Sequence, residues 1–259
     1  MRLVATMLAL TFPLPLAAQL TTLYAGTQVD RGKTFPASAQ FSVETGRVAM
    51  LMKGSQSNRM LFDAKTGVLR IVSDEHQSYF DIDQKGGGPG DPSGMMATMQ
   101  KQLEKLPKEQ RAMAEQMMKS TMASAPTQPQ LVYEWTKEKQ TVLSYDCLMV
   151  HGMRGTNKVT EYCGSTSPDF AMTPAERETI LSMQGLLRNF SIMVKSGDES
   201  RAFQWDTNTD GYPVITRCFR DGQMTLDLKL ESLNRKPIPD SLFVVPNGYK
   251  KMDFSRMGQ

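Results

Sequence analysis

Residues 39–83 alternate between short apolar segments and glycine-containing turns, a pattern that few folds accommodate. The apolar segments are 40–44, 47–52, 59–62, 68–72 and 76–82, and turn signals such as Thr45-Gly46 and Lys53-Gly54 separate them. Strands of this length, joined by glycine turns, are typical of an antiparallel meander. Because no connection is long enough for a parallel crossover, we expect neighbouring strands to run antiparallel.

The strand pattern returns later in the chain, interrupted by helical segments. We expect further strands at 131–137, 201–205, 212–220 and 224–233, and a hairpin around Cys147 and Cys163. One helical insertion covers 95–123, and a second helix begins at Thr173-Pro174-Ala-Glu176, which fits a capping box with proline at the first helical position. We therefore expect residues 19–259 to form a single α+β domain with a large antiparallel sheet.

The first 18 residues have the composition of an export signal. Arg2 is basic, residues 3–16 are largely apolar, and the small residues Ala17 and Ala18 precede Gln19. This order of regions predicts a cleaved signal peptide over residues 1–18 and a periplasmic location. The apolar run is too short to span a bilayer, and no later stretch of the sequence could cross one, so we expect no transmembrane segment in the mature chain.

An exported chain meets oxidising conditions, which favour disulfides. Cys147 and Cys163 are symmetric in sequence about Gly155, at the centre of the expected hairpin, so we expect them to lie opposite one another and form a disulfide. Three cysteines allow three pairings, and this choice leaves Cys218 in a separate strand.

Charge and motif content argue against several functional classes. The 259 residues carry 30 Lys plus Arg and 27 Asp plus Glu, a net charge of only +3, so we expect no nucleic-acid partner. With only two histidines and no hydrolase or zinc-protease motif, we expect no catalytic residues, no metal site and no cofactor. The sequence therefore favours a protein that is not an enzyme.

The C-terminal run Pro239-Asp-Ser-Leu-Phe-Val-Val-Pro-Asn-Gly-Tyr249 resembles the closing signature of an uncharacterised bacterial periplasmic domain-of-unknown-function family. That family is related to lipoprotein carriers of the LolA and LppX type. Gly46-Arg47-Val, Tyr145-Asp-Cys147, Gly211-Tyr-Pro213 and the Met- and Gln-rich segment 108–118 are also similar, although Ser144 stands where the family pattern has glycine. The resemblance implies a strongly curved antiparallel half-barrel with helices across its concave face, between which relatives hold acyl chains or lipidated termini.

Two apolar helix faces are the candidate binding surface. The glycine-rich segment 85–94 suits a hinge, and methionines are adaptable enough to form a lid over an apolar groove. We therefore expect the protein to hold a hydrophobic small molecule, an acyl chain or an acylated protein. The candidate contacts are Met95, Met99, Leu103, Met113, Met117, Ile180, Met183, Leu187 and Phe190.

Two alternatives remain open for the same residues. These side chains can pack on the sheet as ordinary core, which would suit an envelope protein-interaction or stress protein with a filled interior. The methionines can also bind Cu(I), which favours soft thioether ligands, although the nearby chain offers no histidine or cysteine.

Overall fold

The computed structural model describes residues 19–83, 129, 131–193, 205 and 211–252, and the side chains of α3 up to residue 187. Several expected features lie outside these residues. They are the signal peptide 1–18, the hinge 85–94, the Met-rich helices within 95–123, and all of the strand expected at 201–205 except Trp205.

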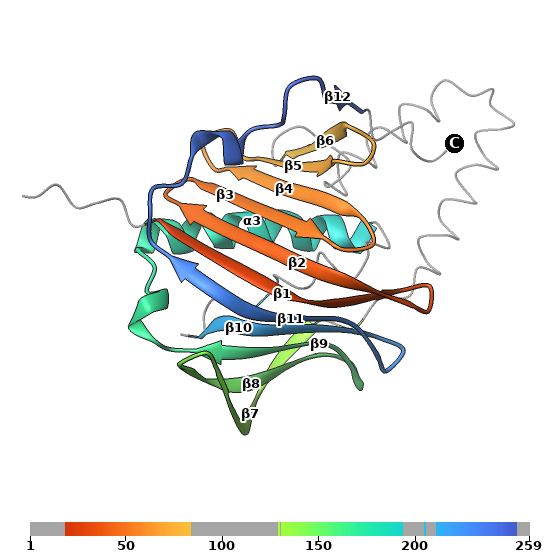
Figure 1. The fold of residues 1–259 in the computed structure, drawn as a ribbon, viewed down its shortest axis with the longest axis vertical. Helices are drawn as coiled ribbons and strands as arrows, with labels where there is room; N and C mark the ends of the chain where they lie inside the picture. The colour runs from red at the N-terminus through yellow and green to blue at the C-terminus, as the bar shows by residue number, and fades with distance from the viewer. Residues whose placement is uncertain (1–18, 84–128, 130, 194–204, 206–210, 253–259) are drawn as a thin grey trace, which may run out of the picture.

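The described residues form one open sheet of twelve strands (Figure 1). Its order is β12-β6-β5-β4-β3-β2-β1-β11-β10-β9-β8-β7, and every neighbouring pair is antiparallel except β12 with β6. The expected antiparallel meander is therefore confirmed for β2 to β6. The strands are β1 (Leu20–Asp30), β2 (Lys33–Glu44), β3 (Arg47–Lys53), β4 (Ser57–Asp63), β5 (Val68–Ser73), β6 (Ser78–Asp83), β7 (Leu131–Val142), β8 (Tyr145–Arg154), β9 (Asn157–Ser165), β10 (Tyr212–Arg220), β11 (Gln223–Asn234) and β12 (Lys250–Lys251).

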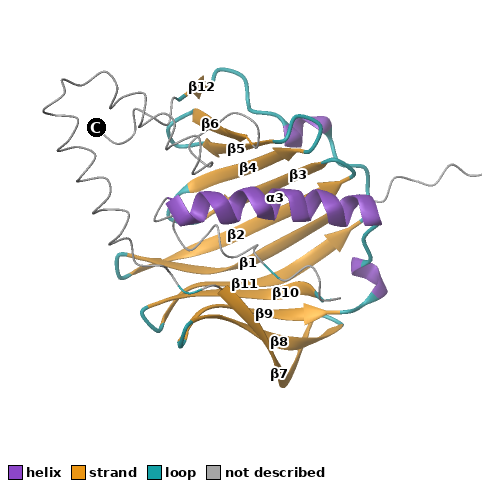
Figure 2. Ribbon diagram, turned by 180° about the vertical axis from the view of Figure 1, so that it is seen from behind, coloured by secondary structure: helices purple, strands orange, loops and turns teal. Residues whose placement is uncertain are grey.

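One α-helix, α3 (Pro174–Met193), lies across one face of the sheet (Figure 2). It contacts β2, β3 and β6, and its residues Ile180, Met183 and Leu187 share a core cluster with Phe41 and Met50 of the sheet. We call this side of the sheet the inner face. The expected set of several helices across the face is not matched, because α3 is the single α-helix of the described residues.

The predicted capping box at the start of α3 is confirmed. The Thr173 backbone N–H donates to Glu176 Oε2 over 2.8 Å, and the Glu176 N–H donates to Thr173 Oγ1 over 3.2 Å. Pro174 occupies the first helical position, where its missing N–H costs no hydrogen bond. The helix therefore begins where the sequence predicts.

The opposite face of β3 to β5 is covered by the C-terminal segment, which includes the short helix η3 (Asp240–Phe243). Ile238 and Phe243 pack there against Ala49, Leu61 and Val72. Both faces of β3 are thus buried, which explains why Val48, Ala49 and Met50 are consecutive apolar residues rather than an alternating pattern.

The cysteine hairpin forms as β8 and β9, joined by a turn in which Gly155 has φ +62°. Cys147 and Cys163 form the predicted disulfide, with a Cα–Cα distance of 5.4 Å. The expectation that they lie directly opposite was wrong, because Met149 is the residue opposite Cys163. A bulge between Gly152 and Met153 shifts the register, so the bridge joins a diagonal pair.

Candidate functional site

The inner face continues beyond α3 onto β1, β11, β10 and β9, as the strand register shows. Tyr24 lies opposite Ala39, Leu228 lies opposite Thr216, and Thr216 lies opposite Tyr162. Since paired residues in a sheet point to the same side, this surface extends the inner face toward the cysteine hairpin. Two pockets mark its ends.

Buried hydroxyl groups are concentrated on this part of the inner face. Thr22 Oγ1 and the Tyr212 hydroxyl form a 2.7 Å hydrogen bond, and the Tyr24 hydroxyl donates to the Pro213 carbonyl over 2.8 Å. Burial raises the pKa of the Tyr212 phenol to about 12 and raises the pKa of Tyr24 well above its ordinary value. At neutral pH both phenols are therefore uncharged hydrogen-bonding groups and not bases.

An aromatic stack builds the first pocket, next to the start of β10. The Phe170 ring, in the short helix η1 (Pro168–Phe170), stacks on Tyr212 at 4.8 Å with an interplanar angle of 5°. The ring centroids of Tyr145 and Phe170 are 4.7 Å apart, and the two rings are tilted at 58° to each other. Phe170 and Tyr212, together with Met172, Arg177 and Gly211, line a cavity of about 370 Å³, which we call the aromatic pocket.

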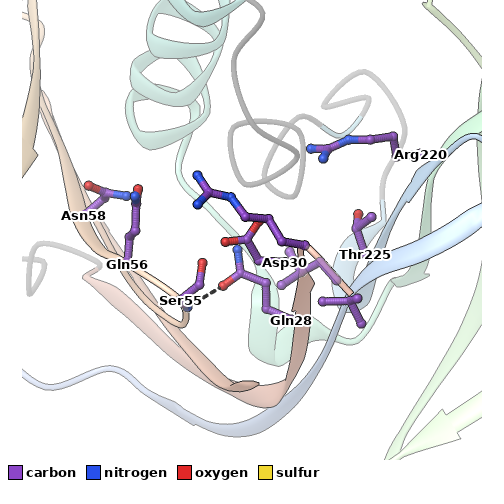
Figure 3. Close-up of a pocket in the computed structure, with 10 residues that line it drawn as sticks. Gln28, Asp30, Ser55, Gln56, Asn58, Arg220 and Thr225 are labelled. Atoms are coloured by element: carbon purple, nitrogen blue, oxygen red, sulfur yellow. Dashed lines mark hydrogen bonds between the residues drawn. The ribbon is translucent and has the colours of Figure 1, made fainter. Parts of the chain in front are cut away.

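A second, polar pocket of about 350 Å³ lies at the other end of β10, where three hairpins meet (Figure 3). Gln28 Oε1 accepts a 2.8 Å hydrogen bond from the Ser55 backbone N–H and so ties the β1–β2 hairpin to the β3–β4 hairpin. Because β10 has nine residues, its two ends, where the two pockets lie, are about 26 Å apart. The polar pocket is lined by Gln28, Val29, Asp30, Arg31, Ser55, Gln56, Asn58, Arg220, Thr225 and Leu226.

The structure places only part of the predicted ligand-binding set. Ile180, Met183 and Leu187 are completely buried in the core between α3 and the sheet. Phe190 belongs to α3, but its side chain is outside the described residues. Met95, Met99, Leu103, Met113 and Met117 also lie outside the described residues.

The sequence did not identify the residues of the aromatic pocket as candidates for binding. Phe170 and Met172 lie between the end of β9 and the capping box of α3, and Arg177 directly follows that box. One available signal was the aromatic residue Phe170, two residues after Pro168 in the loop that leads into the capping box. Their proximity to Tyr212 arises from the pairing of β10 with β9, in which Tyr212 lies opposite Ser165.

The described part of the chain contains neither a cluster of metal-binding side chains nor a helix suited to crossing a membrane. No group of three or more His, Cys, Asp or Glu side chains is placed there to hold a metal ion. None of the described helices combines the length and the apolar character that a membrane crossing requires. Cys218 is buried and lies outside the disulfide.

No protein-family model and no curated protein sequence matches this chain. Among solved structures, PNGF-II in the space groups C2 and P21 is similar, at 11% and 10% sequence identity and with TM-scores of 0.40 and 0.39. The similarity covers 92% of this chain and 32% of PNGF-II, so the chain spans about a third of the length of the structures it matches. TM-scores this low support no inference about fold or function.

Proposed function

We propose that this protein is a non-enzymatic periplasmic binding protein, exported by a cleaved signal peptide, that holds an amphiphilic ligand in the aromatic pocket. The ligand class is an acyl chain with an anionic end, free or attached to another molecule. The observation that carries the proposal is that two aromatic residues, Phe170 and Tyr212, and the basic residue Arg177 line one cavity.

The chemistry of the pocket fits such a ligand. Apolar surface removed from water contributes about 25 cal/mol per Å²; the partly exposed Met172 provides some of that surface, and the nearly buried Phe170 and Tyr212 form the floor of the cavity. Arg177 gives the pocket a positive charge suited to a carboxylate or phosphate. A cavity of about 370 Å³ lies within the range of small-molecule sites.

The proposal moves the ligand away from the surface beneath α3. Ile180, Met183 and Leu187 already fill that surface, so a ligand there would have to displace fully buried side chains. The aromatic pocket is open without such a change. We still expect the sheet to be a curved half-barrel like that of lipoprotein carriers. The Cys147–Cys163 disulfide is compatible with the oxidising conditions of the periplasm.

Native mass spectrometry of residues 19–259, purified without detergent, tests the ligand class. We expect an adduct in the fatty-acyl or phospholipid mass range. A fluorescent fatty acid then tests the site, and Met172→Gln and Arg177→Gln should each weaken its binding about tenfold. Met224→Gln changes the same residue type as Met172→Gln, and Lys236→Gln removes one positive charge as Arg177→Gln does; both lie at exposed positions outside the pocket and serve as controls.

A second candidate is an envelope protein-interaction protein with a filled core. The complete burial of Ile180, Met183 and Leu187 favours it, because packed side chains leave no room beneath α3. A bare protein mass, together with no binding of the fatty acid to the unmodified chain, would support this candidate over the first.

A further inference from the structure

Trp135, one of two tryptophans in the chain, is exposed over 42% of its surface. It lies in β7, the last strand of the sheet, and lines a cavity of about 380 Å³ near the β7–β8 turn. This cavity adjoins the aromatic pocket at Thr166, which lines both. We call it the tryptophan pocket.

The indole ring of Trp135 packs against two glycines, Gly164 and Gly211. A Cβ atom at Gly211 would lie 3.3 Å from Trp135 Cη2 and 3.0 Å from the Gly164 Cα, and a Cβ at Gly164 would lie 3.4 Å from Trp135 Cη2. The edge of the indole ring at Cη2 thus packs against glycine backbone, where any larger residue would crowd it. Trp135 also lines the cavity and stays 42% exposed, so part of its side chain is accessible to a ligand.

The pairing of β7 with β8 is interrupted directly after Trp135, and this interruption sets the position of the residues that follow. The register shifts between Trp135 and Lys139. Thr136 Oγ1 stabilises the break, since it donates to the Met149 carbonyl over 3.0 Å and accepts from the Glu138 N–H over 3.1 Å. As a result Lys139 and Gln140 line the same cavity as the tryptophan ring.

The polar lining of the pocket is balanced in charge. Lys139 carries one positive charge and Asp146 one negative charge, and Gln140, Thr141 and Thr166 are neutral donors and acceptors. Asp146 Oδ1 accepts a 2.8 Å hydrogen bond from Thr141 Oγ1, which orients the carboxylate. A balanced set of this kind favours a neutral, hydroxyl-rich ligand over an ion.

We propose that the tryptophan pocket binds a sugar ring of a neutral saccharide. A pyranose ring has an apolar C–H face, which matches the exposed indole, and a rim of hydroxyls, which matches Asp146, Gln140 and Lys139. The cavity is at the small end of the range of ligand sites, so it suits one or two rings. This inference does not depend on the acyl ligand, because it uses Trp135 rather than the Phe170 stack.

Titration of residues 19–259 with cellobiose, maltose, mannobiose and diacetylchitobiose, followed by tryptophan emission, tests the proposal. Trp205 is only 4% exposed, so changes in acrylamide quenching report on Trp135. We expect at least one disaccharide to bind in the millimolar range and to protect Trp135 from the quencher.

Variants separate the site from the rest of the molecule. Trp135→Ala and the exposed Asp146→Asn should each weaken disaccharide binding about tenfold, as isothermal titration calorimetry would show. Val132→Ala, at another exposed position of β7 outside the pocket, should bind as the unmodified chain does. Asp146→Asn keeps the test decisive if Trp135→Ala unfolds.

Two results would overturn the proposal: no neutral disaccharide binds, whether or not glucuronic acid does, or Asp146→Asn binds a disaccharide as tightly as the unmodified chain does. If Arg177→Gln loses fatty-acid binding but still binds a saccharide, the two sites are independent, and each proposal can be tested without the other.

Discussion

The Cys147–Cys163 disulfide offers a stability prediction whose size follows from the structure. The bridge joins residues 16 positions apart, and on the loop-entropy model closing such a loop stabilises the fold by about 3 kcal/mol. Both cysteines are buried, so replacing them also removes packing around the sulfur atoms. The double variant Cys147→Ala/Cys163→Ala therefore loses the cross-link and two buried sulfurs.

Cys218→Ala supplies the matched control, because Cys218 is fully buried and lies outside the bridge. Its loss in unfolding free energy, about 1 kcal/mol, measures the cost of removing one buried sulfur. The double variant should lose about 3 kcal/mol beyond twice the control. This extra loss corresponds to a fall in Tm of about 6–12 °C for a chain of this length.

Urea unfolding of residues 19–259, followed by tryptophan emission, measures both losses. The double variant should also show a larger m-value, since its unfolded chain is less compact and exposes more surface. The reasoning would be refuted by a double-variant loss no larger than twice the control, because the bridge would then add nothing beyond packing.

Other residues give sharper local tests. Glu176→Ala removes the side chain that accepts from the Thr173 N–H, and should cost about 1 kcal/mol in urea unfolding, whereas Glu178→Ala, exposed on the same turn, should cost little. Burial raises the pKa of Tyr212 from 10.0 to about 12, so the folded state holds this proton more tightly than the unfolded state. Stability should therefore be intact below about pH 10 and fall as the pH rises toward about 12, by about 3 kcal/mol, and Tyr212→Phe should reduce that alkaline loss. At Gly26 an added Cβ would lie 1.8 Å from the Asp227 carbonyl oxygen, so Gly26→Ala should destabilise the β1–β11 pair, and a Tm equal to that of the unmodified chain would contradict this geometry.

Much of the sheet could be predicted because short sequence patterns identify its turns. Gly46 and Gly155 adopt φ angles of +84° and +62°, a region that glycine enters without strain, and the predicted turns fall at these residues. The start of α3 could likewise be predicted, from the capping box formed by Thr173 and Glu176. These signals act over a few residues and do not depend on distant parts of the chain.

The central strand β1 was missed, although it pairs with both β2 and β11. Its inner positions include Thr22, a fully buried polar residue that bonds to the Tyr212 hydroxyl, so the alternation of apolar and polar residues is broken. A turn signal was nevertheless present. Arg31 and Gly32 have φ angles of +48° and +74°, as a tight two-residue hairpin requires.

The pockets could not be predicted because they depend on register. Phe170 and Tyr212 are 42 positions apart and stack because Tyr212 lies opposite Ser165, the last residue of β9. A shift of one residue would turn Tyr212 to the other face. No local pattern specifies such a register, just as none showed that Met149 and not Cys147 lies opposite Cys163.

The distribution of burial in the sheet separates stability from binding. The middle of β3 is covered on both faces, by α3 on one side and by Ile238 and Phe243 on the other, so Val48, Ala49 and Met50 have no surface left for a ligand. The aromatic and tryptophan pockets instead gather at the other part of the sheet, among η1, β7, β9 and the start of β10. Phe170 and Tyr212 of the aromatic pocket belong to the buried core, so a change at either would also cost stability. Trp135, Lys139 and Gln140 lie on the edge strand β7, where a side chain can change without repacking the core. In the proposed saccharide site, changes at these three residues would therefore alter binding and leave the core beneath α3 the same.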